Sequence, residues 1–312
     1  MAINKLMMAA LKALSYPDID LKKHYKLVRS FSDHTKLQLG QPLCRCWDHV
    51  IQAGETAVPV RIFSPFEVGE YPLLIFFHGG GWVTGNIDSY TSVCSHMADL
   101  TRHTVVSVDY RLAPEHPFPS GLTDCYQVTR EIFLHPQAFP VKPEQITLIG
   151  DSAGGNLAAA VSLMARDRGE FLPGRQILLY PATYNDHTAS SPFPSVMENG
   201  TDYLLTSKRI CDYMALYQSS DGDRLNPYFA PYLAEDLSRQ PDTLILTAQY
   251  DPLRDEGEAY GRRLQEAGNR VEIHRIADAL HGFFSLPPSF QLVQQAYERI
   301  NLFLKETSNG KD

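Results

Sequence analysis

Short apolar runs rich in branched residues alternate along the chain with longer stretches whose apolar positions recur at helical spacing. Runs of the first kind predict strands, and stretches of the second kind predict helices. The predicted strands are Leu43–Val50, Ala57–Phe63, Leu73–Phe77, Thr104–Asp109, Ile146–Ile149, Gln176–Tyr180, Thr243–Thr247 and Val271–Ile276. The predicted helices cover residues 88–102, 120–134, 153–168, 206–219, 254–267 and 289–306.

The order of these elements predicts the layers of the fold. From about residue 71 onward strands and helices alternate, which calls for a mostly parallel sheet with helices on both faces. Leu43–Val50 and Ala57–Phe63 are joined by too short a connection for a parallel crossover, so we expect them to pair antiparallel at one edge. The pattern therefore predicts an α/β fold built on a mostly parallel, eight-stranded sheet.

Two segments depart from this alternation. Residues 1–40 show a helical pattern with polar interruptions, and we interpret the start of the chain as an amphipathic helix. A secretion signal is the less favoured alternative, because Lys12 interrupts the apolar stretch and no clear small-x-small cleavage site follows. Residues 183–205 break the rhythm and contain many polar residues. An insertion there would lie above the carboxyl ends of the strands, where open α/β sheets bind ligands.

Composition and charge narrow the classes of protein to which the chain can belong. Hydrophobic residues make up 44% of the 312 residues and charged residues 21%, which is typical of a globular protein. The 36 acidic residues against 28 basic ones give a formal charge of −8. This charge argues against non-specific binding of nucleic acid, which needs a basic surface. No apolar run approaches the roughly 20 residues that span a bilayer, so we expect no membrane partner.

The cysteines favour reduced thiols. The five are Cys44, Cys46, Cys94, Cys125 and Cys211. Their number is odd and no Cys-x-x-Cys pair is present. We therefore expect buried, unpaired thiols in a cytoplasmic protein.

The most informative motif is Gly150-Asp-Ser-Ala-Gly154, which lies between the predicted strand Ile146–Ile149 and a predicted helix. This order is typical of a nucleophile elbow, a strained turn that exposes a serine hydroxyl at the end of a strand. The residues two before and two after the serine come close together, which requires glycine at both positions. We therefore predict that Ser152 is a nucleophile, and that Asp151 has a structural role in holding the elbow or the glycine loop described next.

A second glycine-rich motif, His-Gly-Gly-Gly-Trp at residues 78–82, follows the predicted strand Leu73–Phe77. Glycines let backbone N–H groups turn toward a bound oxygen without obstruction from a Cβ atom. We predict an oxyanion hole made of the backbone N–H groups of Gly79, Gly80 and Ala153. The histidine of the motif precedes the serine, so we expect it to hold the loop rather than to act in catalysis.

A serine nucleophile needs a histidine base, and the base needs an acidic residue that orients it. In this kind of fold the acid and the base follow the serine in the chain. His281 lies between the last predicted strand and the last predicted helix, where such a histidine is expected. His187 lies in the irregular segment, where we expect it to be solvated, and His274 lies within a predicted strand.

Three aspartates are candidates for the acid. Asp251 directly follows a strand, and Pro252 after it fits the first turn of a helix, so we prefer Asp251. Asp255 lies one helical turn further on and should point away from His281 to pair locally. Asp278 is only three residues from His281, which is poor geometry for orienting the ring.

Five segments together resemble the hormone-sensitive-lipase-like family of α/β-hydrolases, and within it the bacterial carboxylesterases and acetyl esterases. They are His78-Gly-Gly-Gly-Trp, Asp109-Tyr-Arg-Leu-Ala-Pro-Glu-His-Pro-Phe-Pro119, Gly150-Asp-Ser-Ala-Gly-Gly155, Asp251-Pro-Leu-Arg-Asp-Glu-Gly257 and His281-Gly-Phe. The resemblance covers residues 70–305 and implies the α/β-hydrolase fold. It also implies a small helical cap of residues 1–40, to which residues 183–220 can contribute, over a catalytic domain of residues 41–312.

The resemblance further implies roles for the site residues and a reaction. Ser152, Asp251 and His281 would form a catalytic triad that cleaves a small-molecule ester through an acyl-enzyme, with the oxyanion donors named above. Many members of the family form dimers, so a homodimer is a further expectation. The chemistry requires no metal or organic cofactor, and no His-Glu-x-x-His zinc motif is present. Two alternatives stay open: an amidase or peptidase with the same triad, and a non-catalytic protein that binds small ligands on this scaffold.

The substrate pocket is assigned from aromatic and large apolar residues near the site. The candidates are Trp82, Tyr184, Met197 and Tyr203, of which Trp82 could equally pack in the core. The predicted cap contains several Lys and Asp residues, which cannot line a long acyl channel without a desolvation cost. Each added methylene gains about 0.8 kcal/mol only while it is buried. We therefore predict a preference for acetyl to butyryl esters.

Overall fold

The computed structural model describes residues 20–34, 43–53, 56–135, 139 and 141–305. Its strands are β1 (Arg45–Ala53), β2 (Thr56–Ser64), β3 (Leu73–Phe77), β4 (Thr104–Val108), β5 (Ile146–Asp151), β6 (Arg175–Leu179), β7 (Asp242–Tyr250) and β8 (Val271–Leu280). They form one sheet in the order β1-β2-β4-β3-β5-β6-β7-β8. β2 pairs antiparallel with β1 and with β4, and all other neighbours run parallel. The predicted mostly parallel sheet with an antiparallel pair at one edge is confirmed.

The helices follow the predicted alternation. The α-helices are α2 (Leu21–His34), α3 (Thr91–Thr101), α4 (Ser120–Leu134), α5 (Ala153–Arg168), α6 (Pro194–Glu198), α7 (Ser207–Tyr217), α8 (Arg254–Glu266) and α9 (Gln291–Lys305). Short 3₁₀ turns occur at η1 (Pro143–Gln145), η2 (Asp221–Leu225), η3 (Pro231–Leu233) and η4 (Phe283–Ser285). The sequence pattern did not predict α6. Of the predicted cap, residues 1–19 and 35–40 lie outside the described residues.

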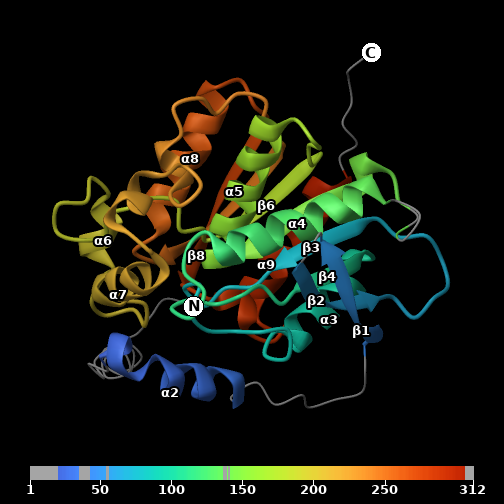
Figure 1. Ribbon diagram of the computed structural model, residues 1–312, viewed down its shortest axis with the longest axis horizontal. Helices are drawn as coiled ribbons and strands as arrows, with labels where there is room; N and C mark the ends of the chain where they lie inside the picture. Colours follow the sequence, from blue (N-terminus) through green and yellow to red (C-terminus); the bar gives the residue numbers. More distant parts are fainter. Residues whose placement is uncertain (1–19, 35–42, 54–55, 136–138, 140, 306–312) are drawn as a thin grey trace.

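The sheet separates two hydrophobic cores. Side chains alternate along a strand, so Leu73, Ile75 and Phe77 of β3 pack with α4, α5 and α8, whereas Leu74 and Phe76 pack with α3 and α9. Figure 1 shows α4 and α5 in front of the strands and α9 behind them. Both faces of β3 are buried, which explains why its sequence is a continuous apolar run rather than an alternating one.

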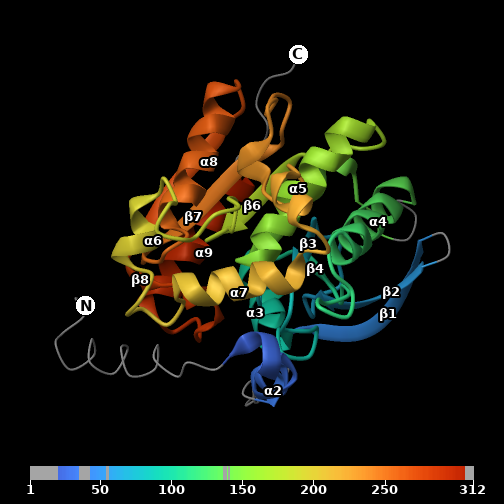
Figure 2. The ribbon, with the colours of Figure 1, turned by 60° about the vertical axis from the view of Figure 1, so that its left-hand side comes forward.

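One edge of the sheet carries the loops of interest. Because β3, β5, β7 and β8 are parallel, the loops that follow them meet at the carboxyl ends of the strands. Figure 2 shows α7 lying across the N-terminal end of α5, with α2 packed against α7. Arg29 of α2 donates from its guanidinium to the carbonyl oxygens of Val83 and Ala113, each at 2.8 Å. These bonds fasten α2 to the loops that follow β3 and β4.

The expectation that His187 is solvated is wrong. The His187 and Glu256 side chains are fully buried, and Nε2 of His187 lies 2.6 Å from Oε2 of Glu256. The other Glu256 oxygen accepts hydrogen bonds from the backbone N–H groups of Thr183 and Tyr184. A buried carboxylate is tolerated only with such partners, so Glu256 fastens the segment after β6 to α8.

The cysteines are free, as expected. Cys44, Cys94 and Cys125 are buried, but Cys211 is half-buried and Cys46 is exposed. The expectation of buried thiols is therefore wrong for Cys46, which lies on β1, the strand at one edge of the sheet.

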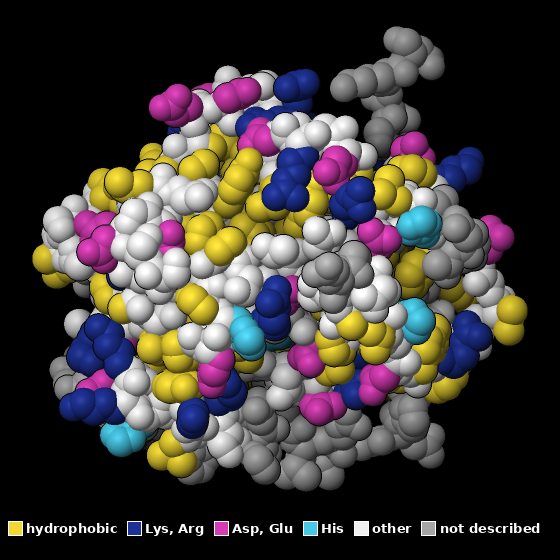
Figure 3. All heavy atoms as spheres, in the orientation of Figure 1, with side chains coloured by type: hydrophobic (Ala, Val, Ile, Leu, Met, Phe, Trp, Pro, Cys, Tyr) yellow, Lys and Arg dark blue, Asp and Glu magenta, His cyan; other side chains and the backbone are white. Residues whose placement is uncertain are grey.

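The surface mixes charges of both signs. Figure 3 shows basic and acidic side chains interspersed on one face, with apolar side chains in several separate groups. On this face the basic side chains do not gather into the continuous patch that binds phosphates of nucleic acid. Within the described ranges, no helix has both the length and the apolar character needed to cross a membrane.

Candidate active site

Ser152 occupies a strained turn between β5 and α5. Its φ of 55° and ψ of −117° are unusual for a residue with a side chain, and its N–H donates to the carbonyl of Leu179 at 2.9 Å. A Cβ atom on Gly150 would lie 2.3 Å from the carbonyl oxygen of Gly154, and one on Gly154 would lie 1.9 Å from that of Phe77. The turn therefore requires Gly150 for the steric reason that the sequence suggested, whereas Gly154 is required because the end of β3 packs against it.

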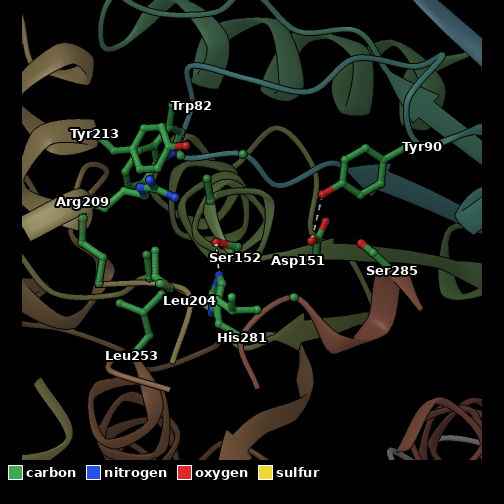
Figure 4. Close-up of a pocket in the computed structure, with 17 residues that line it drawn as sticks. Trp82, Tyr90, Asp151, Ser152, Leu204, Arg209, Tyr213, Leu253, His281 and Ser285 are labelled. Atoms are coloured by element: carbon green, nitrogen blue, oxygen red, sulfur yellow. Dashed lines mark hydrogen bonds between the residues drawn. The ribbon is translucent and has the colours of Figure 1, made fainter. Parts of the chain in front are cut away.

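Three side chains from three different strand ends meet at this turn. His281 directly follows β8, and its Nε2 lies 2.8 Å from Oγ of Ser152. Its Nδ1 lies 2.7 Å from Oδ2 of Asp251, which directly follows β7 and is fully buried. The second Asp251 oxygen accepts a hydrogen bond from the N–H of Leu253 at 2.9 Å. Figure 4 shows Ser152 and His281 facing each other at the pocket.

The two other candidate acids make different contacts. Asp255 accepts a hydrogen bond from the N–H of Ser195 at 2.8 Å and pairs with Arg254 at 2.7 Å. Asp278 has a φ of 59°, and its N–H donates to the side chain of Gln249 at 2.7 Å. Both ring nitrogens of His281 are already engaged. Asp251 is therefore the aspartate whose carboxylate the structure brings to the ring.

The glycine loop differs from the prediction at one position. The N–H of Gly79 donates to Oδ1 of Asp151 at 2.8 Å, so the expectation that Gly79 donates to an oxyanion is wrong. Gly80 and Ala153 line the pocket beside the serine, as predicted. Gly81 lines it too, although it was not among the predicted oxyanion donors. No hydrogen bond to a described residue occupies the backbone N–H of these three residues.

Asp151 and His78 support the glycine loop through a hydrogen bond and through ring stacking. Asp151 is buried, and its Oδ2 accepts a hydrogen bond from the Tyr90 hydroxyl at 3.1 Å, which Figure 4 shows as a dashed line. Burial raises the pKa of Tyr90 well above its usual value, so the hydroxyl stays protonated and can donate this hydrogen bond. The His78 ring stacks on Tyr110 at 4.3 Å, and the Tyr110 hydroxyl donates to the carbonyl of His78. Both residues have the structural roles that we expected.

A pocket with a volume of about 270 Å³ opens beside Ser152. Its walls come from the glycine loop, from the elbow, and from the segment that leads into α7. The side chains that form the wall opposite the elbow are Trp82, Leu204, Leu205, Arg209, Ile210, Tyr213 and Leu253. Among the described residues, no cluster of three or more His, Cys, Asp or Glu side chains could hold a metal ion.

Only part of the predicted pocket is found there. Trp82 lines the pocket and stacks on Tyr217 at 4.4 Å. Tyr184 does not line it, since its ring packs edge-to-face against Phe193 and Tyr232. This aromatic cluster packs Tyr184 into the segment after β6, outside the pocket.

Two more pocket candidates are wrong. The Met197 side chain points to solvent and is 63% exposed, and Tyr203 stacks on Tyr250 at 5.0 Å. The wall is made instead by the next helix, where Arg209 and Tyr213 lie one turn apart and share a face. The sequence predicted this helix, but the face that it turns to the serine depends on its packing and was not predicted.

Comparisons with known proteins identify relatives. The chain matches the model of the α/β-hydrolase fold family over residues 74–285. It is 40% identical over 248 residues to the carboxylic ester hydrolase LipN of Mycobacterium tuberculosis, a match that covers 77% of this chain and 63% of that protein. The chain therefore spans just under two thirds of the length of that relative. It is 36% identical over 247 residues to an arylesterase of Saccharolobus solfataricus, with 79% of each chain covered.

A solved structure supports the same relationship. The hyperthermophilic esterase from the archaeon Pyrobaculum calidifontis superposes with a TM-score of 0.87 at 35% identity, and 98% of each chain is covered. The family match spans β3 through β8 and includes Ser152, Asp251 and His281. The fold and the family resemblance that the motifs predicted are confirmed, and the chain belongs to the α/β-hydrolase fold family.

Proposed function

We propose that this protein is a serine carboxylesterase that hydrolyses small esters through an acyl-enzyme. Ser152 is the nucleophile, His281 is the general base, and Asp251 orients His281. The observation that carries the proposal is the unbroken pair of hydrogen bonds from Asp251 through His281 to Ser152 beside the pocket. The names of the relatives, a carboxylic ester hydrolase and an arylesterase, support hydrolysis of carboxylic esters.

The hydrogen-bond chain supports the following steps. Nε2 of His281 takes the hydroxyl proton while Oγ of Ser152 attacks the ester carbonyl carbon, and the carbonyl electron pair moves onto its oxygen. The buried Asp251 carboxylate stabilises the imidazolium and holds its tautomer. When the tetrahedral intermediate collapses, the C–O bond breaks and the alcohol leaves with the proton from His281. Water then attacks the acyl-enzyme by the same route and releases the acid.

We assign the oxyanion hole to the backbone N–H groups of Gly80, Gly81 and Ala153. These groups line the pocket next to Ser152, and no described residue takes their hydrogen bonds. Fixed donors of this kind are effective because they need no reorganisation when charge develops, and losing one costs about a hundredfold to a thousandfold in kcat. The N-terminus of α5, at Ala153, adds a favourable dipole.

The size of the pocket supports short acyl chains. Its volume of about 270 Å³ lies just below the range of about 300–1,000 Å³ that is typical of ligand pockets. Leu204, Ile210 and Leu253 provide apolar walls that can bury a few methylene groups. An acyl chain that outgrows these walls gains no further burial or meets a clash. We therefore assign acetyl to butyryl esters as the preferred substrates.

The test is a series of kcat/KM values for p-nitrophenyl acetate, butyrate, octanoate and dodecanoate, each below its aggregation limit. We expect the maximum at acetate or butyrate and a fall by octanoate. A maximum at octanoate or beyond contradicts the short-chain assignment. The p-nitroanilide of acetic acid is measured alongside, because a kcat/KM as high for the amide as for the ester would favour the amidase alternative.

A further inference from the structure

One cationic side chain lies in the wall of the pocket. Arg209 belongs to the first turn of α7, and other side chains that line the pocket, among them Ile210 and Leu253, are apolar. Figure 4 shows its guanidinium end turned into the pocket, across Ser152 from Asp151. A charged group in this position lies within reach of a molecule bound at the serine.

The Arg209 guanidinium has no carboxylate partner among the described residues, and it makes no hydrogen bond to them. Other arginines of the molecule differ in this respect. Arg61 lies 2.6 Å from Asp48, and Arg111 lies 2.7 Å from Asp124. Arg209 is half-buried, so it loses part of its hydration without gaining a protein partner, which costs free energy. A bound anion would remove that cost.

Packing sets the position of Arg209. Tyr213 lies one turn further along α7, and its ring packs directly on the glycine loop. A Cβ atom on Gly81 would lie only 2.4 Å from that ring. Burial raises the pKa of Tyr213, and the positive charge of Arg209 opposes this rise, so the two groups are close enough to interact electrically. The face of α7 that carries Arg209 is therefore held against the glycine loop that follows β3 and lines the pocket beside Ser152.

We infer that Arg209 is a specificity-determining residue that binds a carboxylate group of the substrate, so that the preferred substrates are small esters carrying a carboxylate. The planar guanidinium offers paired N–H donors that match the two oxygens of a carboxylate. The carboxylate can belong to the acyl part, as in a monoester of a dicarboxylic acid, or to the alcohol part, as in an acylated hydroxy acid. The inference rests on the proposed function, since it places the reacting ester at Ser152.

The test compares matched pairs of esters, followed by pH-stat titration of the acid released. Monoethyl succinate and ethyl 4-oxopentanoate differ by a carboxylate against a methyl ketone in the acyl part. Acetoxyacetate and acetoxyacetone differ in the same way in the alcohol part. In each pair the neutral ester corrects for any general effect of a substitution on the pocket. The pair that responds shows which part of the substrate carries the carboxylate.

The variants are Arg209→Gln and, as a matched control, Lys208→Gln. Lys208 is the preceding residue on α7, is 61% exposed and pairs with Asp212 at 3.1 Å, so its substitution removes one positive charge from the same helix outside the pocket. Arg209→Gln should lower the anionic-to-neutral ratio of kcat/KM about tenfold to a hundredfold in one pair. The loss should lie mainly in KM, because the contact is made equally in the ground state and in the transition state.

Two results overturn the inference. One is an Arg209→Gln variant that changes both members of each pair alike. The other is a Lys208→Gln variant that lowers the ratio as much as Arg209→Gln does, which would indicate a general field rather than a binding contact. Failure of the proposed function has a different signature, because hydrolysis of the neutral esters would then survive the Ser152→Ala substitution.

Discussion

The two sides of the pocket are built by different means. On one side, Ser152, Asp251 and His281 directly follow β5, β7 and β8, so the register of the parallel sheet sets their positions. On the other side, most of the wall comes from α7 and the segment before it, which are not part of the sheet. Its position depends on side-chain packing, such as the contact of Tyr213 with Gly81. We therefore assign the reaction to side chains that follow the strands, and the choice of substrate to the side chains of the wall.

The two sides are tied together by a few polar contacts. Ser195, at the start of α6, donates from its hydroxyl to the carbonyl of Pro252, and Asn199 at the end of α6 donates to the carbonyl of Asp251. The buried His187–Glu256 pair fastens the same segment to α8. The segment that leads to the wall is thus positioned by contacts to the loop of the proposed acid.

Among the substitutions that distinguish the two sides of the pocket, Ser152→Ala should lower kcat the most. Removing a triad serine costs on the order of a million-fold in kcat in a well-studied protease, and we expect a loss of this order. The measurement is hydrolysis of p-nitrophenyl acetate, with circular dichroism to check the fold. A variant that keeps more than a small fraction of the wild-type rate, with contamination excluded, would falsify the assignment of the nucleophile.

The second effect tests the acid. Asp251→Asn should lower kcat by about ten-thousand-fold, because an amide holds the wrong tautomer of the histidine. Asp255→Asn and Asp278→Asn should cost far less, since the Asp255 side chain pairs with Arg254 and the ring of His281 is already engaged. The three variants are compared by kcat on one ester. If Asp278→Asn proves the most damaging of the three, the acid has to be reassigned.

The sequence predicted the turn at Ser152 because most of the geometry of that turn is local. A strand, two glycines around a serine and a helix can form only a narrow set of turns, and Gly150 is needed because a Cβ atom there would meet the carbonyl group of Gly154, four residues away. The order of strands then brought His281 and Asp251 to the same edge. Gly79 was assigned wrongly because its partner, Asp151, lies 72 residues away and no local pattern shows which glycine N–H it takes.

The residues that form the wall could not be predicted from the sequence for a related reason. Tyr184 and Met197 were selected for their chemistry and their place in an irregular segment, but neither property fixes where a side chain points. The direction of that segment is set by His187 and Glu256, which are 69 residues apart in the chain. Arg209 was missed because its spacing to Tyr213 shows only that the two residues share a face of the helix. The spacing does not show which part of the molecule that face packs against.

A third prediction tests the contact that positions the wall. His187→Ala removes one partner of a fully buried pair and leaves the Glu256 carboxylate without it. Breaking such a pair typically costs about 3–5 kcal/mol, and we expect the free energy of unfolding in urea to fall by this amount. The matched control is His274→Ala, because His274 pairs with Glu272 at 3.4 Å in a half-exposed setting. Pairs of that kind contribute about 0–1 kcal/mol, so equal losses in the two variants would contradict the role given to His187.

The smallest effect concerns the wall itself. Ile210 lines the pocket and is buried, so Ile210→Val adds room for about one methyl group beside Ser152. One more buried methylene gains about 0.8 kcal/mol, which corresponds to a rise of up to about fourfold in the butyrate-to-acetate ratio of kcat/KM. Met197→Ala changes a side chain that points to solvent and should leave that ratio unchanged. If Met197→Ala shifts this ratio more than Ile210→Val does, the acyl pocket has to be reassigned to the segment before α7. If Ile210→Val gives the larger shift, as we expect, substrate choice is assigned to α7 and the reaction to the side chains at the strand ends.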